Sequence, residues 1–110
     1  MHVDAVGMAS AACNDLPWEQ GYENVLNFAH HSAESFLGKV TQVAYTDVPV
    51  SYLLCEDDLI VSPEKQRGFI QVLEEGGRKV DVVSLKAGHC PNWSMPEELG
   101  DVIAAEAERG

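Results

Sequence analysis

Apolar residues follow two different periods along the chain, and prolines and glycines divide those periods into elements. Residues 48–55 form a short, nearly continuous apolar run, which is typical of a strand covered on both faces in a parallel sheet. Pro49 has no amide hydrogen to donate, so we expect it at the beginning of that strand. Residues 79–85 are rich in branched apolar side chains and predict a second strand.

The segment between these two strands predicts a helix over residues 63–75. Ser62 is a favourable capping residue, and Pro63 suits the first turn of a helix. The glycine pair at 76–77 is expected to end the helix. A strand, a helix and a strand of this length form a βαβ unit, in which the crossover is right-handed and the strands are parallel.

Further helices are expected on both sides of this unit. The apolar residues between 18 and 31 recur mostly at helical spacing, which predicts an amphipathic helix. Ser94 and Glu97 have the spacing of a capping box ahead of a helix with one apolar face. Residues 39–45 fit either a short strand or an extended loop. The fold class indicated is therefore α/β, with parallel strands and flanking helices.

Composition and charge narrow the class of protein. The 110 residues allow one domain at most. With 18 acidic and 7 basic side chains the net charge is −11, which repels phosphate backbones and anionic lipids, so we expect neither nucleic acid nor a membrane as partner. No apolar run could cross a bilayer and no secretory signal is evident, so a cytoplasmic location is expected. Three cysteines without a close pair indicate free thiols, with no metal site and no cofactor.

Two loops carry residues suited to catalysis. In an open α/β sheet, ligands and catalytic groups gather where the strands end at their carboxyl side. Residues 56–58 follow the first predicted strand with three acids, and residues 88–91 follow the second with a Gly-His turn. An acidic turn alone is more often a solvated turn, and a lone histidine is more often structural. Together in a βαβ unit they could meet, with a carboxylate fixing the tautomer of the imidazole.

These residues also carry a resemblance to a known family. In this order, residues 14–17, 48–58 and 88–91 resemble three segments of α/β-hydrolases, namely the exit from the cap region, the strand and loop of the triad acid, and the turn of the triad histidine. The chain is similar to the C-terminal half of these proteins, particularly of a fungal type found beside biosynthetic genes. The resemblance implies a partial α/β-hydrolase fold.

The same resemblance implies a division of the chain into three parts. Residues 1–13 would be a loose N-terminus, residues 14–47 a cap-like helical segment, and residues 48–110 the C-terminal βαβα part of the hydrolase domain. Cap regions usually shape the substrate pocket in this family, so aromatic residues of the second part could line a pocket. The alternative, that they are plain core or partner-facing residues, is the commoner case for aromatic residues. These aromatic residues are Trp18, Tyr22 and Phe28.

The resemblance also implies which residues form the site. Asp58 matches the last residue of the family's Cys-Glu-x-Asp pattern and would be the triad acid, with Asp57 as the alternative. His89 would be the general base. Cys90 stands where the pattern more often has serine, and we interpret it as a tolerated small residue rather than a nucleophile.

The nucleophile of this family lies in a G-x-S-x-G turn ahead of the acid and the histidine. No serine of these 110 residues has glycines at that spacing. We therefore expect no hydrolysis by the chain alone, and a small-molecule ester as substrate if a missing N-terminal half supplies the nucleophile. The alternative is a non-catalytic module that associates with itself, because a short parallel sheet has open edges and its apolar strands need cover. A homo-oligomer is expected in that case.

Overall fold

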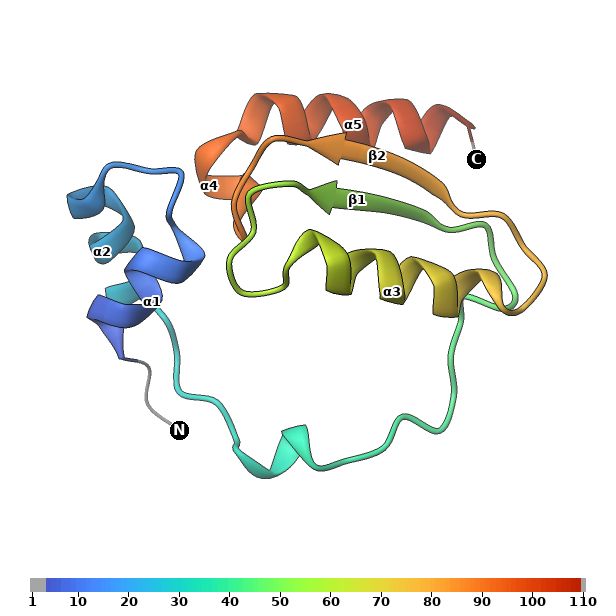
Figure 1. Ribbon diagram of the computed structural model, residues 1–110, viewed down its shortest axis with the longest axis horizontal. Helices are drawn as coiled ribbons and strands as arrows, with labels where there is room; N and C mark the ends of the chain where they lie inside the picture. Colours follow the sequence, from blue (N-terminus) through green and yellow to red (C-terminus); the bar gives the residue numbers. More distant parts are fainter. Residues whose placement is uncertain (1–3, 110) are drawn as a thin grey trace.

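The computed structural model describes residues 4–109 as a pair of short helices and a βαβ unit, joined by a long loop (Figure 1). The elements follow one another with these bounds: α1 Ala5–Ala12, α2 Trp18–Leu26, the 3-10 turn η1 Glu34–Phe36, β1 Ser51–Cys55, α3 Pro63–Glu74, β2 Asp81–Leu85, α4 Pro91–Ser94 and α5 Pro96–Arg109. No helix of this described part is long and apolar enough to cross a membrane.

The sheet consists of two parallel strands, with β1 paired to β2 from Ser51 opposite Asp81 to Cys55 opposite Leu85. Helix α3 connects them, and α3 and α5 lie on opposite sides of the sheet (Figure 1). The predicted α/β class, with parallel strands and flanking helices, is confirmed. Both strands point towards the helix pair α1–α2, so the loops at their carboxyl ends face these helices (Figure 1).

The signals at the ends of α3 act as the sequence predicts. The hydroxyl of Ser62 accepts a hydrogen bond from the amide of Lys65, and Pro63 occupies the first turn. Gly77, with a φ angle of 88°, reverses the chain after the helix in a conformation that suits only glycine well. The helix thus ends where the glycine pair predicts, within one residue.

The predicted N-terminus differs from the structure. Of the residues expected to be loose, 1–3 lie outside the described residues, and 5–12 form α1. Small side chains explain the helix, because Ala9 and Ala12 are buried against α2 and allow the two backbones to approach closely. The approach is closest at Gly21, where an added Cβ would lie 2.8 Å from the Cβ of Cys13.

Other elements are shorter than the sequence predicts. Helix α2 ends at Leu26 instead of continuing to about residue 31. The next residue, Asn27, turns its side chain back and donates a hydrogen bond to the carbonyl of Glu23 at 3.1 Å. Residues 39–45 contain no strand and run as a loop. The capping box is wrong: Ser94 belongs to the last turn of α4, and its buried hydroxyl has no hydrogen-bond partner among the described residues. Pro96 starts α5, which leaves Met95 rather than Ser94 just before that helix.

The core beneath the sheet is small. Leu54 is the only large side chain among residues 4–109 that is fully buried, and it packs with Ile70 of α3 and with Val80. The radius of gyration is 15.7 Å, whereas a compact domain of this length has about 13 Å. Several apolar side chains are therefore left exposed on the surface, among them Phe69, Val72, Val82 and Ile103.

Because this small cluster holds α3 on the sheet, truncation of its central side chain should be costly. We expect Leu54→Ala to lower the free energy of unfolding by about 2 to 5 kcal/mol, through lost burial and an unfilled cavity. Urea denaturation measures the change. The matched control is Leu37→Ala, because Leu37 is 84% exposed and its truncation should change stability by less than about 0.5 kcal/mol. Equal effects of the two substitutions would contradict this account of the core.

Candidate active site

The acid loop begins directly after β1 and turns sharply around the carboxylate of Asp58. One oxygen, Oδ1, accepts hydrogen bonds from the backbone amides of Ile60 at 2.8 Å and Val61 at 2.9 Å. This is the local turn that aspartate forms readily with amides two and three residues ahead. The side chain of Asp58 is 6% exposed, and the turn leaves its second oxygen free to accept from another residue.

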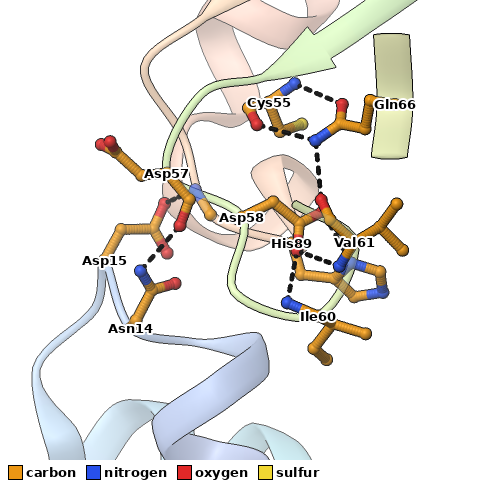
Figure 2. Close-up of polar contacts among 10 residues, drawn as sticks. Asn14, Asp15, Cys55, Asp57, Asp58, Ile60, Val61, Gln66 and His89 are labelled. Atoms are coloured by element: carbon orange, nitrogen blue, oxygen red, sulfur yellow. Dashed lines mark hydrogen bonds and ion pairs between the residues drawn. The ribbon is translucent and has the colours of Figure 1, made fainter. Parts of the chain in front are cut away.

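That residue is His89, from the loop after β2. Its Nδ1–H donates to Oδ2 of Asp58 at 2.9 Å (Figure 2). The two loops therefore emerge at the same edge of the sheet, as expected for neighbouring parallel strands. Asp58, rather than Asp57, makes the contact, and the structure thus favours the first of the two acids that the sequence left open.

The orientation of the imidazole matters for chemistry. Because Nδ1 is engaged with the carboxylate, the tautomer with its proton on Nδ1 leaves a lone pair on Nε2. No residue of the described chain makes a hydrogen bond to Nε2. The His89 side chain as a whole is 36% exposed. The arrangement can accept a proton at Nε2 and stabilise the resulting cation.

Two opposing effects act on the pKa of Asp58. Burial raises it, but hydrogen bonds from His89 and from the amides of Val61 and Ile60, together with the charge of His89, outweigh burial and hold the pKa below its ordinary value of 3.8. Asp58 is consequently ionised at neutral pH. An ionised carboxylate is what an orienting partner for a histidine base requires.

A buried glutamine that no sequence pattern singled out holds both ends of the acid loop. Gln66 of α3 accepts a hydrogen bond from the amide of Cys55 and donates to the carbonyls of Cys55 and Val61, each at 2.9 Å (Figure 2). Its spacing was a usable signal, because Gln66 stands one turn before Ile70 on the face of α3 that packs on the sheet. It clamps both ends of the loop that carries the acid.

The thiol of Cys90 is unsuited to act as a nucleophile. Burial above all, and then negative charge on neighbouring groups beginning with Cys13, raises its pKa to about 11. Because the thiolate is the reactive form, Cys90 is almost entirely unreactive at neutral pH. All three cysteines are free thiols.

The aromatic residues of the expected cap-like segment lie in two places. Phe28 stacks on Trp93 of α4, with ring centroids 5.6 Å apart, and belongs to the packed core of the helix pair. Trp18 and Tyr22 stack on each other at 5.0 Å, and Trp18 is largely exposed. Neither group lines a described cavity beside His89. Residues 4–109 also contain no cluster of three or more His, Cys, Asp or Glu that could hold a metal ion.

The known proteins to which this chain is similar are named as hydrolases. No family model matches the chain. A probable hydrolase, R7, from Phoma sp. is 61% identical over 108 residues, which is 97% of this chain but 44% of that protein. The chain is a homologue of α/β-hydrolases. The α/β hydrolase nvfD of Aspergillus novofumigatus is 37% identical over 52% of the chain, and a pyrethroid hydrolase of Sphingobium wenxiniae is 39% identical over 56%.

The resemblance to α/β-hydrolases seen in the sequence is confirmed, and the chain is hydrolase-like. It spans less than half the length of the relatives that it matches, namely 44% of the Phoma protein and 22% and 21% of the other two. This share is consistent with the C-terminal half of a fungal hydrolase. The two parallel strands with flanking helices are consistent with an α/β-hydrolase fold.

The role of Gln66 predicts a large effect from a modest substitution. We expect Gln66→Ala to lower the free energy of unfolding by about 2 to 4 kcal/mol, because the buried amide and carbonyl of Cys55 lose their partner. Chemical denaturation measures the loss. Gln71→Ala is the matched control, since Gln71 lies exposed on the same helix and its removal should be nearly neutral. A neutral Gln66→Ala would show that the loop holds its shape without the glutamine.

The ionisation of Asp58 predicts how stability depends on pH. Because its pKa is lower in the folded than in the unfolded chain, ionised Asp58 stabilises the fold above about pH 4, and this contribution is lost as the pH falls through the folded pKa. Asp58→Asn should therefore cost about 1 to 3 kcal/mol at pH 7. The difference from the wild type should shrink towards pH 2.

Unfolding curves from pH 2 to pH 7 test this expectation. Asp57→Asn is the control, because the Asp57 side chain makes no hydrogen bond with the described residues. The free energy of unfolding of this variant should change with pH as that of the wild type does. A cost of Asp58→Asn that is the same at pH 2 and pH 7 would contradict the assigned contacts.

Proposed function

We propose that this chain supplies the acid and base of a hydrolase that cleaves a carboxylic ester or a related bond in a small molecule. In this proposal Asp58 is the triad acid and His89 is the general base. The observation that carries it is the 2.9 Å hydrogen bond from Nδ1 of His89 to a carboxylate that two backbone amides already hold. The hydrolase names of the relatives support the reaction class.

The chemistry assigned to His89 has two proton transfers. Nε2 takes the proton of an attacking hydroxyl as that oxygen bonds to the carbonyl carbon, and the imidazolium then returns a proton to the departing alcohol. Water attacks the resulting acyl intermediate in the same manner and releases the acid. Asp58 stays ionised throughout, and its charge stabilises the imidazolium during both steps.

The nucleophile and the donors that stabilise the oxyanion come, in this proposal, from outside these 110 residues. No G-x-S-x-G turn occurs in the sequence, and Cys90 has a pKa of about 11. A general base without a nucleophile forms no acyl intermediate, so the 110 residues alone should be inactive. The alternative of a non-catalytic, self-associating module is not favoured, because the relatives are named as hydrolases.

Turnover of a short-chain aryl ester tests the proposal. We expect the 110-residue chain to show no turnover above a His89→Ala variant. Joined to the part of the Phoma sp. hydrolase that lies outside the match, it should become active. His89→Ala in the joined protein should lower kcat at least about 10,000-fold. The control is His31→Ala in the joined protein, which removes a histidine outside the two loops and should leave kcat close to that of the wild type.

Two results would overturn the proposal. Turnover by the 110 residues alone that disappears in His89→Ala would place a nucleophile within this chain. A joined protein that folds but hydrolyses no ester in a His89-dependent manner would remove the assigned role of the histidine. A serine-directed phosphonate adds a direct measurement, because it should label the joined protein stoichiometrically and leave the 110 residues unlabelled.

A further inference from the structure

Two consecutive residues in the turn between α1 and α2 reach both loops of the acid–histidine pair. The side chain of Asn14 donates from Nδ2 to the carbonyl of Asp57 at 2.9 Å, and Oδ2 of Asp15 accepts from the amide of Gly88 at 2.7 Å. Each bonded group belongs to the residue just before the acid or just before the histidine. Figure 2 shows both side chains extending from the helices towards these loops.

The contact at Gly88 leaves no room for a side chain. A Cβ added there would lie 2.8 Å from Oδ1 of Asp15 and closer still to Oδ1 of Asn14. A side chain at this position would displace the two side chains from their hydrogen bonds, although the backbone of Gly88 does not have a positive φ angle. The glycine of the Gly-His turn therefore serves the contact with the α1–α2 turn.

Apolar packing holds that turn against the same two loops. The core of the helix pair, which includes Cys13 next to Asn14, packs against Ile60 from the acid loop, Cys90 from the histidine loop and Trp93 of α4. The hydrogen bonds of Asn14 and Asp15 thus come from a turn that is packed against the loops. Sequence separations of 43 and 73 residues show that both contacts are tertiary.

Between the two loops themselves, beyond the ends of the strands, the backbone bonds are few. The amide of Glu56 donates to Leu85 at 2.9 Å, and the amide of Asp57 donates to Ala87 at 3.0 Å. The second bond accepts at the carbonyl of the Ala87–Gly88 peptide group, and Asp15 binds the amide of that same group, so the group is held from both sides. Asn14 binds the next peptide group of the acid loop, between Asp57 and Asp58.

We infer that Asn14 and Asp15 are positioning residues, which set the acid loop and the histidine loop at the separation where Asp58 meets His89. They touch neither the carboxylate nor the imidazole and act through the peptide groups that precede them. The role in catalysis rests on the proposed function, whereas the effect on the geometry of the pair does not.

The hydrogen-bonded Nδ1 proton of His89 provides a direct readout in the 110-residue chain. Proton NMR at low temperature should show this proton downfield, and His89→Ala assigns it by its loss. In the double variant Asn14→Ala, Asp15→Ala we expect its exchange with water to be at least about tenfold faster, because a tenfold change corresponds to about 1.4 kcal/mol and two hydrogen bonds are removed. The single variant Asp15→Asn keeps an oxygen acceptor for Gly88, so its Nδ1 proton should exchange nearly as slowly as that of the wild type.

The control is Glu19→Ala, which removes an exposed acid from α2 near the same turn and should leave the resonance unchanged. Circular dichroism verifies that each variant keeps its helices. Should the double variant unfold, Asn14→Asp decides by the same readout, because it keeps the size of the side chain but removes the donor to Asp57. If the double variant, or Asn14→Asp in its place, is folded and its Nδ1 proton keeps the wild-type position and exchange rate, the inference is overturned.

Activity of the joined protein separates this inference from the proposed function. If both hold, the double variant should lower kcat about 100-fold with little change in KM, since a small displacement of a catalytic group costs that much. If ester hydrolysis fails altogether, the NMR result still decides the positioning role. An altered Nδ1 proton with unaltered kcat would show that the residues shape the pair without serving the reaction.

Discussion

The parallel pairing of β1 and β2 is the constraint on which the rest of the structure depends. It brings the carboxyl ends of the strands, Cys55 and Leu85, side by side. The pairing continues one residue further, because the amide of Glu56 donates to the carbonyl of Leu85. Both loops then start from the same edge of the sheet, only one strand spacing apart. Residues 31 positions apart in the chain can meet for this reason, and Asp58 contacts His89 although neither residue has a cis peptide bond or a positive φ angle.

Polar contacts supplement a small apolar core in holding the loops. Only Leu54 is a large, fully buried side chain in the described part of the chain. The acid loop is fixed by Gln66 from α3 and by its own turn around Asp58, and the α1–α2 turn adds bonds from Asn14 and Asp15. Such bonds are directional, so they set the geometry of the pair more narrowly than apolar packing would.

Some predictions failed because neighbouring elements decided the outcome. The residues of α1 are small and show no helical period, yet Ala9 and Ala12 are buried once α2 covers them. The spacing of Ser94 and Glu97 satisfies a capping pattern, but Ser94 is the last residue of the preceding helix α4 and so cannot cap α5. Residues 39–45 have β propensity, but they meet no partner strand, and such propensity depends strongly on context.

The sequence by itself determined the βαβ order, the ends of α3 and the two loops that bear the acidic residues and the histidine, because these depend on local signals such as apolar runs, caps, prolines and glycines. The tertiary structure alone decided that Asp58 rather than Asp57 faces His89, since the two differ only in the direction that the turn gives them. It alone revealed Gln66, Asn14 and Asp15 as supports of that pair. Their partners lie 5 to 73 residues away in the chain, and no local pattern encodes contacts over the longer of these distances.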